Sequence, residues 1–138
     1  MAKTCAVAAL IATIFCFSPL LNLAQATSET FFVEGKVYCD TCRVQFETKI
    51  SQPLAGIYRL PVDGDHEEEI CEVVALKSSR ADCSDLMAGY ERARITLTNK
   101  NGLASIARYP NPLGFMVKEA LPSCLEILAE MGLIPLDL

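Results

Sequence analysis

The chain has 138 residues and a formal net charge of −5 at pH 7. An acidic chain with no basic cluster is a poor candidate for binding nucleic acid or an anionic membrane surface. Its length is enough for one domain and not for two, and seven cysteines in so short a chain indicate a disulfide-stapled extracellular protein.

The first 26 residues have the pattern of a secretory signal peptide. Lys3 is followed by an apolar stretch, Cys5 to Leu21, and then by Ala24-Gln25-Ala26, which predicts cleavage between Ala26 and Thr27. A membrane anchor is the alternative, but as a helix the stretch would span roughly 25 Å, less than the roughly 30 Å hydrocarbon core. We therefore expect residues 27–138 to form a single domain, secreted to the extracellular space or cell wall, with no membrane span.

The first part of the predicted domain alternates between apolar and polar residues. This period of two predicts strands over Thr30–Tyr38 and over Gln45–Ser51. Gly35 is expected to mark a bulge or a close approach of the backbone. The stretch Ser51–Gly56 contains proline and glycine and is expected to be a loop.

Further strands follow, separated by turn signals. Asp63-Gly64 is a turn signal between two strands, and Asn101-Gly102 suggests a hairpin turn. The expected strands are Tyr58–Val62, Ile70–Leu76, Ala93–Thr98 and Leu103–Arg108.

The carboxyl end changes to a helical pattern. Pro122 at a helix start and Gly132 just past its end bracket Ser123–Met131. Several short strands and one terminal helix predict a mainly β fold, a small disulfide-stapled β-sandwich or barrel with a short C-terminal helix.

Two features could in principle bind a metal. The acidic run from Asp63 to Glu69 lacks the central glycine and closing glutamate of a calcium loop, so we expect a solvated turn. Cys39-Asp40-Thr41-Cys42 has the spacing of half a zinc site, but a second C-x-x-C is absent and His66 is the sole histidine. We therefore expect no metal and no cofactor.

The same C-x-x-C spacing occurs in thioredoxin-like redox motifs. That chemistry wants the pair at a helix amino terminus within a βαβ unit, whereas strand patterns flank Cys39 and Cys42 on both sides. Hydrolytic catalysis through His66 would depend on a residue of an acidic, exposed turn. We therefore expect no catalytic residues, and Cys39 and Cys42 to be structural half-cystines.

Three stretches of the chain resemble the pollen Ole e 1 allergen and extensin family of plants. They are Phe32–Arg43, Ser78–Cys83 and Asn111–Cys124, and they occur in the family's order. The resemblance implies a small secreted β-rich domain with three disulfides, often found in pollen and the cell wall, to which no enzymatic activity is firmly attached.

The resemblance also implies how the cysteines pair. Carried over to this chain, Cys39 pairs with Cys83 and Cys42 with Cys124. The family's partner for Cys71 lies in an internal segment that this chain lacks near residues 53–57, where Gly56 leads directly into the next strand. We hypothesise a skipped exon or a faulty gene model.

Without the signal peptide the chain keeps five cysteines, so one must remain unpaired within a molecule. We expect Cys71 to be a free thiol or to link two copies into a dimer. Loss of the third bridge should cost roughly 2–5 kcal/mol, which predicts a marginal, aggregation-prone or dimeric product.

The leading functional hypothesis is a secreted non-enzymatic binding or structural module. Its partner would be a cell-wall component or an extracellular protein. The alternatives are an extracellular thiol–disulfide or other enzyme that uses Cys39 and Cys42, and a non-functional truncated splice form.

Overall fold

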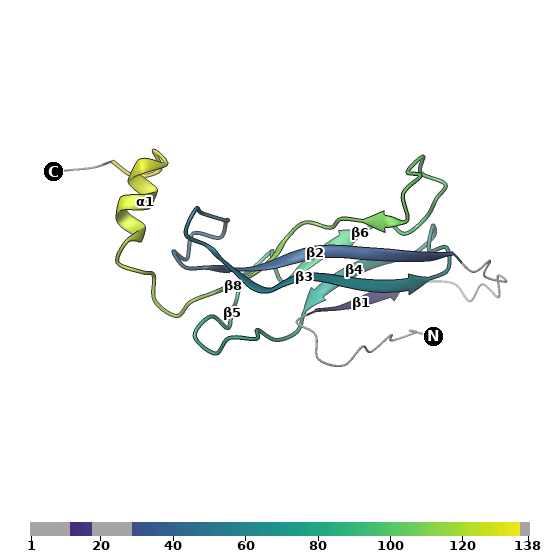
Figure 1. Ribbon diagram of the computed structural model, residues 1–138, viewed down its shortest axis with the longest axis horizontal. Helices are drawn as coiled ribbons and strands as arrows, with labels where there is room; N and C mark the ends of the chain where they lie inside the picture. The colour runs from purple at the N-terminus through teal and green to yellow at the C-terminus, as the bar shows by residue number, and fades with distance from the viewer. Residues whose placement is uncertain (1–11, 18–28, 136–138) are drawn as a thin grey trace.

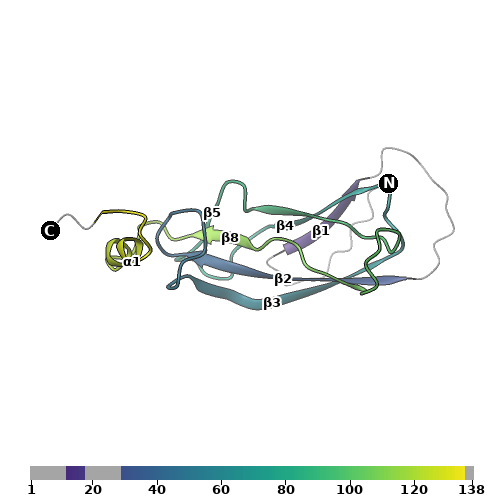
Figure 2. The ribbon, with the colours of Figure 1, turned by 90° about the horizontal axis from the view of Figure 1, so that it is seen from above.

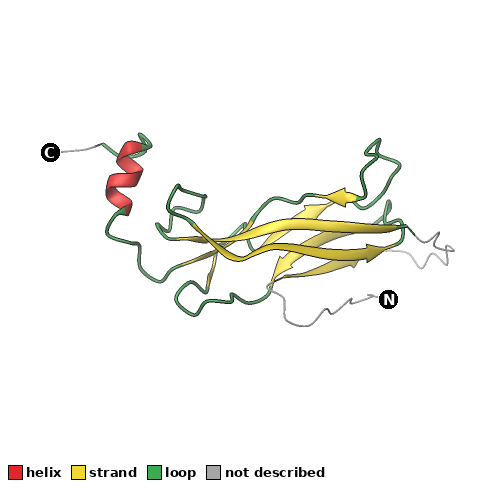
Figure 3. Ribbon diagram, in the orientation of Figure 1, coloured by secondary structure: helices red, strands yellow, loops and turns green. Residues whose placement is uncertain are grey.

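The computed structural model describes residues 12–17 and 29–135, which form two β-sheets and one short helix (Figures 1 and 3). One sheet has the strand order β1-β4-β6, and the other has the order β3-β2-β8-β5 with β7 added beside β2. The elements are β1 (Ala12–Phe17), β2 (Thr30–Asp40), β3 (Gln52–Asp63), β4 (Ile70–Ala75), β5 (Asp85–Leu86), β6 (Arg92–Ile95), β7 (Ala107–Arg108), β8 (Leu113–Met116) and α1 (Cys124–Glu130).

The core lies between the two sheets. Figure 2 shows β2 and β3 on one side of the body and β1 and β4 on the other. Phe31 and Val33 of β2 and Val73 of β4 are completely buried and belong to one apolar cluster. The predicted fold class, mainly β with a short C-terminal helix, is confirmed.

Strand β2 runs along the centre of the larger sheet, and the expected strand over Thr30–Tyr38 is confirmed. Its antiparallel register with β3 shifts between Lys36 and Val37, which marks a bulge. Gly35 lies directly opposite Tyr58, and a β-carbon at Gly35 would fall 2.6 Å from Cζ of that ring. Only glycine lets the aromatic ring cross the strand here.

The strand predicted for Gln45–Ser51 is wrong, because this segment is a turn and loop. The buried carboxylate of Asp40 accepts hydrogen bonds from the backbone N–H of Cys42 at 2.9 Å and of Gln45 at 2.7 Å. Arg43 and Gln45 adopt positive φ angles of 58° and 63°. This coiling around one carboxylate overrides the alternating pattern.

The loop predicted for Ser51–Gly56 is also wrong from Gln52 onward, where β3 begins. Ala55 and Gly56 have positive φ angles of 52° and 71°, and they lie where the register with β2 shifts. Gly56 is accommodated by this irregularity, and Pro53 is accommodated because β3 is the edge strand of its sheet.

The strands expected at Ile70–Leu76 and Ala93–Thr98 are present as β4 and β6, although β6 is shorter. The strand expected over Leu103–Arg108 is reduced to β7, which pairs parallel with β2. Arg108 is buried, and its guanidinium donates to the carbonyl oxygens of Thr98, Ser105 and Ala107. These bonds hold the connection from β6 in a folded loop rather than a hairpin.

Helix α1 stands at one end of the molecule, away from the sheets (Figure 1). Its bounds, Cys124–Glu130, agree with the helix predicted between Pro122 and Gly132, and Gly132 has a positive φ of 72° just past the end. Cys124 is its only buried residue. Among the described residues, no helix is long and apolar enough to cross a lipid bilayer.

Strand β1 comes from the segment predicted to be a signal peptide. It pairs antiparallel with β4 along its full length, from Ala12 opposite Ala75 to Phe17 opposite Ile70. The predicted cleavage position, between Ala26 and Thr27, lies outside the described residues, so cleavage stays a prediction.

Candidate functional site

Two disulfides join distant segments of the chain to the end of β2 and to the turn after it. Cys39 is bonded to Cys83 and Cys42 to Cys124, the pairing that the family resemblance implied. All four half-cystines are buried. In the chain-entropy model, bridges across separations of 44 and 82 residues contribute about 4 and about 4.5 kcal/mol respectively.

The C-x-x-C pair therefore does not have the arrangement of a dithiol redox site. Its two sulfur atoms are bonded to distant partners and not to each other. Cys39 also lies in β2 and Cys42 in the turn after it, so the pair does not stand at the amino terminus of a helix, where a redox pair of this spacing is found.

The third disulfide joins Cys16 of β1 to Cys71 of β4. In the full chain these two residues can bond because the paired strands β1 and β4 set them directly opposite each other. The predicted free thiol of Cys71 concerned the chain without residues 1–26. The free thiol stays a prediction for a chain that begins at Thr27.

Cys71 also lies in a cluster of side chains that can bind a metal. A ring nitrogen of His66, a carboxylate oxygen of Glu69 and the sulfur atoms of Cys16 and Cys71 all lie within 4.8 Å of one another. Cys71 is buried, and the side chains of His66 and Glu69 are 18% and 25% exposed. Sequence reasoning placed His66 in an exposed turn and missed this cluster, although the spacing His66-x-x-Glu69-x-Cys71 was visible in the sequence.

The backbone of this turn is bonded to the segment that follows β6 and to itself. The N–H of His66 donates to the carbonyl oxygen of Leu97 at 2.8 Å, and the N–H of Glu69 donates to the carbonyl oxygen of His66 at 3.0 Å. Nε2 of His66 lies 2.9 Å from the carbonyl oxygen of Asp63, and Nδ1 lies 3.0 Å from Oε2 of Glu69. The imidazole ring is thus fixed from both of its nitrogens.

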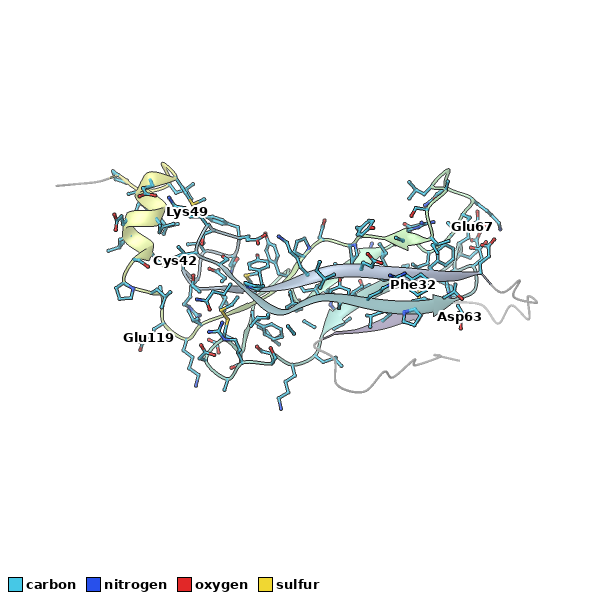
Figure 4. All side chains as sticks on the ribbon, in the orientation of Figure 1. Phe32, Cys42, Lys49, Asp63, Glu67 and Glu119 are labelled. Carbon is cyan, nitrogen blue, oxygen red and sulfur yellow. A yellow bond between two sulfur atoms is a disulfide. The ribbon has the colours of Figure 1, made fainter. Side chains whose placement is uncertain are left out.

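Two further acids of the run face a lysine at the end of the molecule where Figure 4 shows Glu67 and Asp63. Lys100 forms ion pairs with Asp65 and Glu67. Partial burial acts to raise the pKa of Asp65, but hydrogen bonds from Thr98, the Glu67 N–H and Lys100 outweigh it and lower that pKa. The turn carries paired, largely solvated charges, as the sequence suggested.

Comparison with known proteins shows to which family this disulfide-stapled chain belongs. The sequence pattern described as "Pollen protein Ole e 1 like" matches residues 54–132. The chain belongs to the Ole e 1-like family.

Curated plant proteins of the Ole e 1-like family cover most of the chain. "Anther-specific protein LAT52" from Solanum lycopersicum is 43% identical over 149 residues, covering 88% of this chain and 92% of its own. "Olee1-like protein" from Betula pendula is 44% identical over 152 residues, covering 88% and 91%. "Pollen allergen Che a 1" from Chenopodium album is 37% identical over 163 residues, covering 96% of each chain.

A solved structure shows the same Ole e 1-like fold. The crystal structure of the major plantain pollen allergen Pla l 1 superimposes with a TM-score of 0.61 at 28% sequence identity. The superposition covers 69% of this chain and 99% of the plantain allergen.

The alignments also bear on the missing segment. The alignment with the tomato protein extends over 149 residues, more than the 138 residues of this chain, so the tomato protein has residues with no counterpart here. That the gap falls after Gly56 remains a prediction of the sequence analysis.

Proposed function

We propose that this Ole e 1-like protein is an extracellular, non-enzymatic module that binds a cell-wall component or another extracellular protein. The observation that carries the proposal is the fixed bridging of Cys39 and Cys42 to distant cysteines. The two cysteines are therefore part of a rigid frame and are not available as reactive thiols. Loops held on such a frame are where binding residues commonly lie.

Secretion with loss of residues 1–26 is part of the proposal. Disulfides persist in oxidising compartments such as the secretory pathway and the cell exterior, and the amino-terminal pattern is that of a cleaved signal. Expression of the full chain in secretory plant cells should give a product whose mass begins at Thr27. Alkylation without reduction should modify one cysteine, Cys71. An intact leader in the secreted product would contradict this part of the proposal.

Binding is tested with the secreted protein and isolated cell-wall material. Native protein should co-sediment with the wall fraction, whereas protein that has been reduced and alkylated should not, because the frame that presents the loops is then lost. Equal binding of the two forms would show adhesion by an unfolded chain and would count against a folded binding module.

The thiol–disulfide enzyme is the second candidate, and the bridging pattern disfavours it. A redox pair attacks an external disulfide as a thiolate and is then bridged to itself. The native protein should therefore not accelerate the reduction of insulin by dithiothreitol. Acceleration that disappears in Cys39→Ser would favour the enzyme.

A further inference from the structure

We propose that His66, Glu69 and Cys71 bind a divalent transition metal of the zinc type once residues 1–26 have been removed. The inference rests on the leader removal included in the proposed function. In the full chain the sulfur of Cys71 is bonded to Cys16 and cannot act as a thiolate ligand. In the processed chain Cys16 is gone and the Cys71 thiol is free.

The hydrogen bonds of His66 set the ring for metal binding. The carbonyl oxygen of Asp63, 2.9 Å from Nε2, can only accept, so Nε2 carries the proton. In a neutral ring Nδ1 then presents its lone pair. A histidine ligand whose other nitrogen donates to a backbone carbonyl is the usual arrangement around bound metals.

The partner of Nδ1 is Glu69, which is a second potential ligand. Oε2 of Glu69 lies 3.0 Å from Nδ1, and an ionised carboxylate also only accepts. Nδ1 and a carboxylate oxygen at this distance can share a ring proton, as in an ion pair, or bind a metal ion that takes the place of that proton. His66 and Glu69 thus present two ligand atoms to one point.

The sulfur of Cys71 completes a set of three protein ligands. All the ligand atoms lie within 4.8 Å of one another, and around tetrahedral Zn²⁺ they would lie about 3.3–3.8 Å apart. Rotations of the three side chains would bring the atoms to these distances. The sulfur of Cys16 is bonded directly to that of Cys71, and an S–S bond of about 2 Å is close to the Zn–S distance of about 2.3 Å. Loss of Cys16 therefore frees space for the ion itself, and a water molecule would be the fourth ligand.

The surroundings suit a metal with mixed sulfur, nitrogen and oxygen ligands. A cavity of about 220 Å³, lined by Glu69, Ile70, Cys71, Arg94, Ile95 and Thr96, adjoins the cluster. It offers an entry path. Soft thiolate and imidazole ligands select zinc-type ions over Ca²⁺ or Mg²⁺. Binding would release the thiol proton of Cys71, so affinity should rise with pH.

The test uses the protein secreted by cells that express the full chain, after its mass has been measured. Titration with Co²⁺, a spectroscopic substitute for Zn²⁺, should produce sulfur-to-cobalt charge-transfer absorption in the near ultraviolet, and Zn²⁺ should abolish it. Cys71→Ser should remove the charge-transfer band. His66→Gln and Glu69→Gln should weaken binding by about 10–100-fold or more.

Glu67→Gln is the matched control, because Glu67 lies in the same turn but pairs with Lys100; it should bind Co²⁺ as the unmodified protein does. Absence of the charge-transfer band from a product that begins at Thr27, or dimers linked through Cys71, would overturn the metal site while leaving secretion intact. A secreted mass that still includes residues 1–26 would overturn both the metal site and the proposed removal of the leader. The measured mass therefore distinguishes failure of the metal site alone from failure of leader removal.

Discussion

Gly35 and Tyr58 lie directly opposite each other in the β2–β3 pair. The ring of Tyr58 lies over Gly35, and the tyrosine hydroxyl is buried without a hydrogen-bond partner among the described residues. Burial raises the pKa of Tyr58 to about 12. Both properties follow from the same crowded position.

Gly35→Ala should destabilise the protein. The new β-carbon would meet Cζ of Tyr58 at 2.6 Å, and such overpacking costs about 1–3 kcal/mol. Urea unfolding measures the loss. In a Tyr58→Ala background the same substitution should cost less, because the ring is gone. An equal loss in both backgrounds would mean that the clash is not with Tyr58.

Tyr58→Phe should be neutral or stabilising by up to about 1 kcal/mol at pH 7, because it removes a buried hydroxyl without a partner. The folded pKa lies above the ordinary value of 10.0, so this tyrosine's contribution is full below pH 10 and is lost as the pH rises towards 12. Urea unfolding between pH 9 and 12 should show a smaller decline for Tyr58→Phe. Identical pH profiles for the two proteins would show that the raised pKa of Tyr58 does not cause the decline.

At the scale of elements, the link between β2 and β3 is organised by a side chain and not by a hairpin turn. Asp40 is fully buried and accepts two backbone hydrogen bonds. Helix α1 depends on the same region, since Cys124 is bonded to Cys42 and the N–H of Leu121 donates to the carbonyl oxygen of Thr41 at 3.0 Å. A seven-residue helix would not be stable alone in water.

Asp40→Asn should therefore cost about 1–3 kcal/mol, because an amide has one acceptor oxygen where the carboxylate uses two. Urea unfolding measures this cost. Asp85→Asn is the matched control: Asp85 pairs with Arg43 at the half-exposed end of β5, and exposed ion pairs contribute about 0–1 kcal/mol. Equal losses in the two variants would show that the buried carboxylate does not organise the turn.

At the scale of the whole molecule, the amino-terminal segment completes the smaller sheet. β1 covers one edge of β4, and β6 covers the other. Removing residues 1–26 would leave the β1-facing edge of β4 open, with Cys71 and the buried Val73 along that strand. Open edges favour association between chains.

A full chain that retains residues 1–26, oxidised after purification, should be more stable than its Cys16→Ser variant. The Cys16–Cys71 bridge closes a separation of 55 residues, which corresponds to about 4 kcal/mol in the chain-entropy model. Denaturant unfolding measures the difference. Cys16→Ser/Cys71→Ser should match the single variant, since each lacks the same bridge; a further loss in the double variant would assign Cys71 another role.

The sequence by itself determined the family, the mainly β class, the strand from Thr30 and the helix between Pro122 and Gly132. The family follows from three motif stretches in order along the chain. The strand and the helix follow from local signals, namely a period of two, a proline at a helix start and a glycine just past its end.

Only the tertiary structure decided what lies after β2, where Asp40 coils an alternating segment into a turn, and which residues gather around Cys71. His66 and Glu69 approach that sulfur because the backbone of the turn bonds to Leu97, far along the chain. Hydrogen bonds that satisfy buried polar groups outweigh an alternating pattern. The partners of Asp40 are near in the sequence, but the burial of its carboxylate depends on tertiary packing, whereas the partner of His66 lies far along the chain.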